Sequence, residues 1–180
     1  IFPDEWLLSM PVGLRAVGLP APGLPAGVNV VNVNVGALND ARINSPLSGL
    51  LAETLYTVQV GGSGVSGSNN TVLYRGNTPV AREGEVAPGT SELFGNFLSV
   101  DNARINSAGQ VAFAHDLATG GAATNGVVYR HTPGSGLTLL ARDAAPAPGT
   151  SGEFFSGAGF FSPRINSGGQ VAYLGELSTG

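Results

Sequence analysis

Two histidines and an aspartate lie where the residue types could support acid–base or metal chemistry. His115 and Asp116 adjoin in the phrase QVAFAHDL, and His131 follows VVYR. If these phrases form a hairpin, the two imidazoles approach each other, but a zinc site needs three or four ligands and no third one is apparent. Alignment of the repeats described below places Glu53 and Gly175 at the position of His115. We therefore interpret the histidines as polar side chains on a half-exposed sheet.

Other catalytic sites are excluded by composition or lack a motif. The chain has no Cys and no Lys, which removes thiol nucleophiles, disulfides and Schiff-base lysines. No Ser lies in a G-x-S-x-G elbow, and GGSGVSGSNN is typical of a flexible hairpin loop. NDARIN and DNARIN lack the EF-hand pattern and are typical of Asx turns. We predict that the protein is not an enzyme and holds no cofactor and no metal ion.

The chain is dominated by an internal repeat. The phrase RINS begins at Arg42, Arg104 and Arg164, which are 62 and 60 residues apart. VLYR and VVYR, VAR and LAR, and two copies of APGT recur in step, so seven of the 8 Arg residues occupy repeat positions. A fixed period of this length marks a tandem supersecondary unit. Because residues repeated in every unit serve the unit, we expect the arginines, with the adjacent Glu83 and Asp143, to form ion pairs or Arg–carbonyl bonds.

Each unit reads as four short strands. QVAFAHDL alternates apolar and polar residues, VVYRH and LTLLAR are rich in strand-forming residues, and EFFSGAGFF or ELFGNFLSV is an aromatic fourth strand. NSAG and NSGG suit type I turns that join the fourth strand of one unit to the first of the next, and APGT suits a type II turn. Gly and Pro interrupt every candidate helix. We predict an all-β fold of tandem four-stranded antiparallel units, arranged as blades or a sandwich.

The aromatic fourth strands allow two interpretations. Six phenylalanines could form a sugar-stacking platform or could fill the core between sheets. We favour the core, because Phe is usually buried and no Trp or Tyr cluster joins these residues. The six are Phe94, Phe97, Phe154, Phe155, Phe160 and Phe161.

The repeats leave an N-terminal arm and an incomplete last unit. We assign 1–27 to an extended Pro/Gly-rich arm and 28–180 to a β-repeat domain, with units at about 38–100 and 101–161 and a partial unit at 162–180. The arm is apolar but interrupted by prolines, as in an extended strap. The last strand has an apolar edge that needs a partner. The candidate self-assembly residues are Trp6, Leu7, Leu8, Leu14, Val17 and Leu19 in the arm and Val171, Tyr173, Leu174 and Leu177 in the last strand.

Two segments are candidates to pair with that last strand. The stretch VNVVNVNV (Val28–Val35) has the alternation of a half-buried strand, with Val31, Val33 and Val35 on one face. It could fold back and complete the last unit within the same chain. Alternatively, the arm of another subunit adds a strand from outside. The first arrangement predicts a monomer, and the second predicts a head-to-tail polymer.

Composition points to a secreted protein without nucleic-acid contacts. The net charge is −4 and the pI is about 5.0, whereas a nucleic-acid footprint requires clustered basic residues. The uncharged stretch 16–39 is long enough to span a membrane, but its prolines and asparagines make it a poor spanning helix, and we predict no membrane span. Low charge with many small polar residues is common in secreted β-proteins. The sequon at Asn69 makes this residue a possible site for a covalent glycan.

These phrases also resemble a known kind of sequence. RINSAGQVAF followed by NGVVYR and LTLLARDAAPAPGT, together with PVAREGEVAPGT, is similar to bacterial secreted and surface β-repeat proteins that carry N-x-x-G-Q-V-A-F and V-A-R-E-G-x-x-A-P-G-T signatures. The resemblance covers about Leu38–Gly180 and omits the arm. It implies a secreted or surface location and identifies no activity. The combination of a compact repeat domain with an arm also resembles the protomer of an extracellular fibril.

The sequence therefore supports two hypotheses about function. The first is a structural subunit of a secreted extracellular filament, whose partners are other copies of itself, assembled head-to-tail by exchange of the arm or a strand. The alternative is a monomeric secreted binding module for surfaces or glycans, with the sheet closed by Val28–Val35 of the same chain.

Overall fold

The computed structural model describes residues 17–33, 42–43, 53–96, 102–118 and 125–178, and within them the protein has strands and no helix. The prediction of an all-β fold is confirmed. The strands are β1 (Val28–Val33), β2 (Arg42–Ile43), β3 (Thr54–Gly62), β4 (Thr71–Arg75), β5 (Thr78–Arg82), β6 (Ala103–Ile105), β7 (Val111–Asp116), β8 (Gly126–Thr132), β9 (Gly136–Arg142), β10 (Phe154–Ile165) and β11 (Val171–Ser178).

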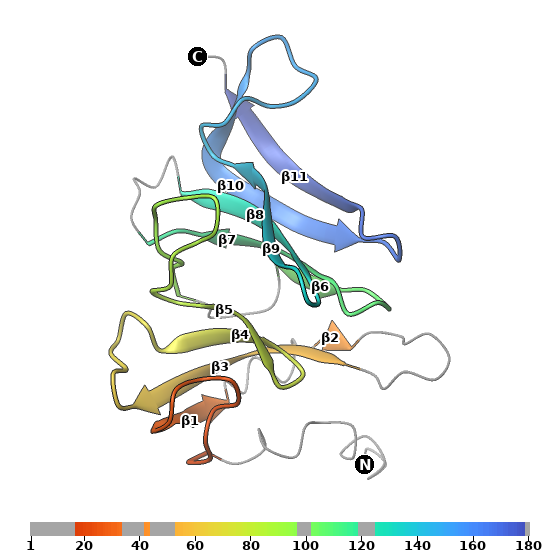
Figure 1. Ribbon diagram of the computed structural model, residues 1–180. Helices are drawn as coiled ribbons and strands as arrows, with labels where there is room; N and C mark the ends of the chain where they lie inside the picture. Colours follow the sequence, from red (N-terminus) through yellow and green to blue (C-terminus); the bar gives the residue numbers. More distant parts are fainter. Residues whose placement is uncertain (1–16, 34–41, 44–52, 97–101, 119–124, 179–180) are drawn as a thin grey trace, which may run out of the picture.

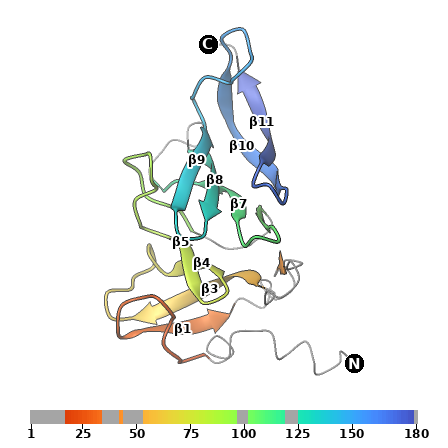
Figure 2. The same ribbon diagram turned by 45° about the vertical axis from the view of Figure 1, so that its right-hand side comes forward.

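The strands form three antiparallel sheets that lie one above another. In the first sheet, β1 and β2 both pair with β3, and β4 and β5 follow. The second sheet has the order β6-β7-β8-β9, and the third consists of β10 and β11. Figures 1 and 2 show the stack from the first sheet at the bottom to the β10–β11 hairpin at the top.

The second and third RINS phrases lie at the start of hairpins that have the same strand register. Arg104 pairs with Ala112 in the second sheet, and Arg164 pairs with Ala172 in the third. The turn between them has the predicted form, because the Asn106 carbonyl accepts the Gly109 N–H at 3.0 Å. The predicted fourth strand therefore pairs with the first strand of the following unit.

The valine–asparagine strand belongs to the first sheet. Val28 lies opposite Gly62 and Val33 opposite Val58, so β1 pairs with β3 and does not close the last unit. The prediction that this stretch pairs with the final strand is wrong. A bulge between Val30 and Asn32 also interrupts the simple alternation. Val30 is buried as a result, whereas Val31 is 48% exposed.

Apolar side chains fill the spaces between adjacent sheets. The largest cluster joins the first and second sheets and includes Leu55, Leu73, Phe113 and Tyr129. A smaller cluster joins the second and third sheets through Ala114, Val128, Ala141 and Phe160. A further cluster lies on the other face of the first sheet and includes Ala21, Val58, Val72 and Tyr74. Burial of these surfaces supplies the main driving force for stacking.

The aromatic fourth strands contribute to the core only in part. Phe94 and Phe160 are buried, as predicted, and Phe155 is half-buried. Phe154 and Phe161 remain exposed. Phe97 lies outside the described residues.

Candidate functional site

The two histidines do not form a site. On the paired strands β7 and β8, His115 lies opposite Val127 and His131 lies opposite Val111. His131 is buried, contrary to its predicted half-exposed position, and burial lowers the pKa of both imidazoles. In the described ranges, no group of three or more His, Cys, Asp or Glu residues is placed to hold a metal ion.

The sequence alignment also misplaced the first-unit counterpart of His115. His115 pairs with Val127, and the corresponding pair in the first sheet is Val58 with Val72. The counterpart is therefore Val58, not Glu53. The error arose because the stretch between β2 and β3 is longer than the turn between β6 and β7.

The repeated arginines connect each sheet to the next. Arg75 on β4 donates from Nη1 to the Gly109 carbonyl at 3.2 Å, and Arg130 on β8 donates from Nη1 to the Gly169 carbonyl at 3.0 Å. Both acceptors are the last residue of the N-S-x-G turn in the following sheet. Arg75 also lies 3.5 Å from Glu53. The prediction that repeated arginines form structural carbonyl bonds is confirmed at these positions.

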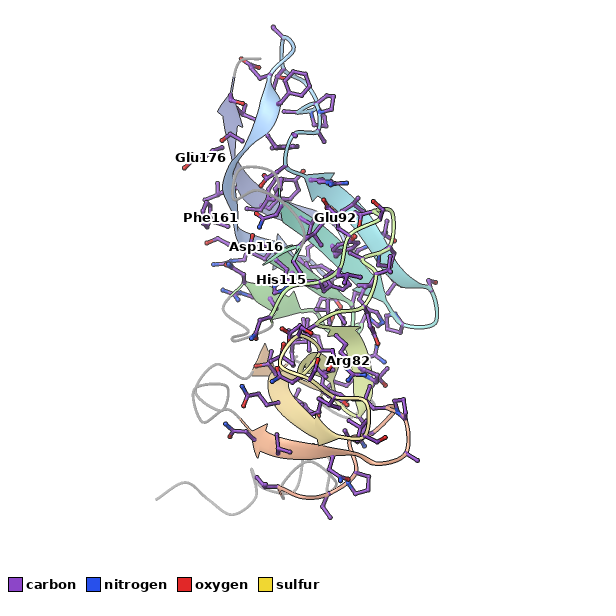
Figure 3. All side chains as sticks on the ribbon, turned by 90° about the vertical axis from the view of Figure 1, so that its left-hand side faces the viewer. Arg82, Glu92, His115, Asp116, Phe161 and Glu176 are labelled. Carbon is purple, nitrogen blue, oxygen red and sulfur yellow. The ribbon has the colours of Figure 1, made fainter. Side chains whose placement is uncertain are left out.

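The arginines of the VAR and LAR phrases also have structural partners. Arg82 Nε donates to the Asn69 carbonyl at 2.9 Å, and Arg142 Nη2 lies 2.7 Å from a carboxylate oxygen of Glu92. Figure 3 shows Arg82 on the first sheet and Glu92 beside the second. These bonds tie loops to strands and leave no sign of a basic binding surface among these residues.

The acidic residue after each of these arginines holds the start of a strand. Glu83 accepts the backbone N–H groups of Asn70 and Thr71 at 3.0 and 3.1 Å. Asp143 accepts the Gly126 N–H at 2.8 Å. Burial raises the pKa of Asp143, although this N–H donor opposes the shift. Both carboxylates are structural, and neither pairs with the arginine beside it in the sequence.

The repeated tyrosines connect the first and second sheets to the turns that precede them. The Tyr74 hydroxyl donates to the Pro22 carbonyl at 3.0 Å, and the Tyr129 hydroxyl donates to the Pro88 carbonyl at 2.6 Å. Pro88 is the second residue of an APGT turn, and the same position in the next copy is Pro148. The sequence pattern showed these tyrosines as repeat positions but did not reveal their partners.

The third sheet differs from the others at β11. Strands β3 and β7 are central strands, with neighbours on both edges. β11 is the counterpart of both, yet among the described residues it pairs with β10 alone. No strand of the described ranges therefore occupies its second edge, where β4 and β8 lie in the other two sheets.

The candidate assembly residues on β11 fall on its two faces. Val171 and Tyr173 are half-buried and pack against the cluster between the second and third sheets. Leu174 on the opposite face is 66% exposed, and Leu177, which shares the face of Tyr173, is 47% exposed. Figure 3 shows Phe161 and Glu176 on the outer side of this hairpin. The open edge thus combines an apolar outer face with an unpaired strand.

The turn end of the hairpin is also hollow. A cavity of about 270 Å³ lies there, open to solvent. Its lining is formed by Arg164, Ile165, Asn166, Gln170, Val171 and Ala172. Ala172 is the counterpart of Ala112, which faces Arg130 of the neighbouring strand in the second sheet. The hollow therefore lies between the adjoining ends of β10 and β11 and their turn.

The candidate residues of the arm are described in part. Val17 and Leu19 are exposed, at 65% and 41%. Trp6, Leu7, Leu8 and Leu14 lie outside the described residues.

The predicted glycosylation site lies in an ordered loop. The Asn69 side chain accepts the Ser66 N–H at 2.7 Å and donates from Nδ2 to the Gly64 carbonyl at 3.0 Å. A glycan at Asn69 would replace one of the two hydrogens on the Nδ2 atom that makes this bond.

The sequence places the protein in a family whose function is not known. The profile described as "Family of unknown function (DUF7453)" matches residues 15–180. The chain belongs to this family. The match begins at Arg15 and so includes much of the segment that precedes β1. No curated protein and no solved structure matches the chain.

The described residues also bear on membrane insertion. They contain no helix with the length and apolar character needed to cross a bilayer.

Proposed function

We propose that the protein is a structural subunit of a secreted extracellular filament, assembled head-to-tail by addition of strands to β11. The observation that supports this proposal is that no described strand pairs with the second edge of β11. The counterparts β3 and β7 are each paired on both edges. An unpaired strand edge is a template for pairing with another chain.

Comparison of equivalent positions shows how much apolar surface this edge exposes. Leu174 corresponds to Thr57 and Ala114, which are 1% and 7% exposed, whereas Leu174 is 66% exposed. Leu177 corresponds to Leu117, which is 2% exposed, whereas Leu177 is 47% exposed. The single charge on β11 is Glu176, so the strand has little of the charge or proline that protects natural edges. Ala114, the counterpart of Leu174, packs against the following sheet, so a neighbouring subunit that covers this face would bury Leu174.

The opposite end of the molecule offers apolar chain that could provide such a strand. Val17 and Leu19 are exposed there, and the sequence before them includes Trp6, Leu7 and Leu8. Figure 1 places residues 17–27 beside β1, at the other end of the stack from β11. A contact between opposite ends of identical subunits is heterologous, and repeated without ring closure it builds a fibre.

Composition and resemblance support a location outside the cell. The chain has few charged residues and resembles secreted and surface repeat proteins in its repeat phrases. Within this proposal the partners are other copies of the chain, with a covalent glycan at Asn69 where the source attaches one.

Deletion of residues 1–16 tests the proposal. We expect the full chain to form filaments in negative-stain images and the deletion variant to stay monomeric in sedimentation. Residues 17–27 are retained because Ala21 is buried and Pro22 accepts the Tyr74 hydroxyl. Filaments of unchanged appearance from the deletion variant would contradict arm exchange.

A point variant tests the edge without shortening the chain. Leu174→Arg should abolish filaments, because a charge would enter the new strand interface. Leu140→Arg is the matched control, since Leu140 is an exposed leucine on β9, which is also an edge strand. Equal loss of filaments in both variants would count against a specific role for β11. A full chain that stays monomeric at high concentration and binds a glycan would favour the alternative, a binding module.

A further inference from the structure

The second unit departs from the repeat at three neighbouring positions, two of them acidic. Asp116 ends β7 and pairs with Gly126 at the start of β8. Asp143 directly follows β9 and accepts the Gly126 N–H at 2.8 Å. The residues that take these places in the first unit are Gln59, Thr71 and Glu83. Because the two units are otherwise alike, this difference points to a role that the sheet itself does not require.

In the first unit, protein donors surround the acidic side chain. Oε2 of Glu83 accepts the Asn70 and Thr71 N–H groups at 3.0 and 3.1 Å. The same oxygen accepts the Thr71 hydroxyl at 3.1 Å. The residue opposite Thr71 is Gln59, which is neutral. One negative charge therefore has three hydrogen-bond donors.

The second unit has more negative charge and fewer donors. Gly126 stands in place of Thr71 and has no hydroxyl, so its N–H is the one donor that the described residues give to Asp143. The other carboxylate oxygen of Asp143, Oδ1, is buried and has no hydrogen-bond partner within the described ranges. Asp116 stands in place of Gln59 and adds a second carboxylate.

The strand register brings the two carboxylates together. The Leu117 N–H donates to the Asn125 carbonyl at 2.8 Å. Asp116 and Gly126 lie one residue along, so they form a non-hydrogen-bonded pair, in which opposite side chains lie closest. A Cβ atom on Gly126 would lie 2.7 Å from Oδ2 of Asp143. The Asp143 carboxylate thus occupies the space where a side chain at position 126 would face Asp116.

Both carboxylates lie on the face of the second sheet that is turned toward the third. Side chains alternate along β7, so Asp116 shares the face of Ala114, which packs against the third sheet. His115 lies on the opposite face. Figure 3 shows Asp116 on the side of His115 that is nearer the β10–β11 hairpin.

The charge on this face has no basic partner among the described residues. Arg142 adjoins Asp143 in the sequence, but its guanidinium lies 2.7 Å from Glu92. Asp143 is only 3% exposed, and a buried carboxylate without compensation is strongly unfavourable. A buried polar atom without a partner in a native protein is explained by a water molecule or an ion. A second carboxylate beside it favours a cation.

We propose that Asp116 and Asp143 hold a divalent cation of the calcium class across the ends of β7, β8 and β9. Calcium prefers oxygen ligands and accepts carboxylates together with water. Oδ1 of Asp143 and the Asp116 carboxylate supply the protein ligands, while Oδ2 of Asp143 keeps its bond to Gly126. A site with two carboxylates is weak, with a Kd on the order of 1 mM, as in extracellular modules. The site does not depend on the proposed filament.

This proposal departs from the expectation that the chain holds no metal ion. That expectation considered the histidines, and the described ranges indeed contain no group of three or more His, Cys, Asp or Glu residues that could hold one. The proposed site has two carboxylates and no imidazole. His115 takes no part, because its Nε2 lies 3.1 Å from the Gly95 carbonyl oxygen on the other face of the strand.

Thermal unfolding of the full chain, followed by circular dichroism, measures the effect of the cation. An ion that binds only the folded chain raises its stability by mass action. At about 10 mM CaCl₂, roughly ten times the expected Kd, the melting temperature should rise by roughly 3–6 °C. The reference is NaCl at equal ionic strength. An unchanged melting temperature overturns the proposal.

A variant at the exposed ligand tests the position of the site. Asp116→Asn removes one ligand without disturbing the buried carboxylate, and it should reduce the shift in melting temperature at least about threefold. Glu176→Gln is the matched control, since Glu176 is an exposed acid on β11, and it should keep the full shift. Equal shifts in the parent chain and in Asp116→Asn would overturn the site.

A variant at the buried ligand separates a metal ligand from a purely structural acid. Asp143→Asn keeps an oxygen for the Gly126 N–H and removes the charge. Without Ca²⁺ this variant should be at least as stable as the parent chain, because the repulsion from Asp116 is gone, and Ca²⁺ should not shift its melting temperature. A variant that is less stable than the parent and responds fully to Ca²⁺ would overturn the proposal. If Asp143→Asn does not fold, the comparison of Asp116→Asn with Glu176→Gln decides.

Discussion

Removal of one hydroxyl tests how the turns and sheets are coupled. Tyr129 is fully buried, and its hydroxyl donates to the Pro88 carbonyl at 2.6 Å. Its ring centroid lies 5.4 Å from that of Phe94 and 5.7 Å from that of Phe113. Tyr129→Phe keeps this ring packing and deletes the hydrogen bond, leaving the Pro88 carbonyl without this donor.

The expected loss follows from those contacts. A neutral hydrogen bond contributes about 1 kcal/mol, and an unsatisfied acceptor raises the cost of its removal to about 2 kcal/mol. At about 2–4 °C per kcal/mol for a chain of this size, the melting temperature should fall by roughly 2–8 °C. Tyr129→Ala should cost about 3–5 kcal/mol, because it also opens a cavity among the aromatic rings.

Urea denaturation followed by far-ultraviolet circular dichroism measures these changes. Tyr173→Phe serves as the control, since the Tyr173 hydroxyl makes no hydrogen bond to the described residues, and its cost should stay within about 0.5 kcal/mol. The reasoning is refuted if Tyr129→Phe is as stable as the parent chain, or if it costs as much as Tyr129→Ala.

Three further predictions concern stability. Asn106→Ala should cost about 2 kcal/mol in urea denaturation, because this buried amide bonds two backbone N–H groups and a carbonyl of the next turn; a neutral result would show that the turn needs no side-chain support. Gly134→Ala should cost about 1 kcal/mol for its positive φ in open space, and Gly62→Ala should cost more because its Cβ would lie 2.0 Å from the Gly27 carbonyl oxygen; equal melting temperatures for the two variants would contradict the close approach. Burial, and then the nearby Arg75, lower the pKa of His131. The neutral imidazole therefore contributes its full stability above pH 6.5, and this contribution is lost as the pH falls below that value. His131→Gln should reduce the slope of unfolding free energy against pH below 6.5, and an unchanged slope would contradict the prediction.

The strands and turns could be predicted because their signals are local. Alternation, β-branched residues and the N-S-x-G and A-P-G-T phrases each report on a few neighbouring residues, and the observed turns have the expected hydrogen bonds. Which strands pair is a non-local property that a repeat period does not contain. The fourth strand of a predicted unit therefore pairs with the first strand of the next unit and not within its own unit. The bulge between Val30 and Asn32 also shifts the buried face of β1.

The candidate site was predicted in outline but not in detail. The apolar residues of the last strand were visible in the sequence, yet only the structure separates Tyr173, which packs inward, from Leu174, which is exposed. Residues 17–30 have the same pattern of backbone hydrogen bonds as the segment from Gly84 to Phe94. The sequence hid this likeness because the turn reads APGL and the loop after it is longer. Ala21 bonds to the carbonyl of Val28, whereas Ala87 bonds to that of Glu92. Backbone hydrogen bonds reveal an equivalence that the residue types obscure.

Electron cryo-microscopy of the assembled full chain tests the central claim most directly. The account predicts that a strand of a neighbouring subunit pairs along the edge of β11 and covers the Leu174 side chain. A filament in which the edge of β11 is open, or is paired with residues of its own chain, would contradict it.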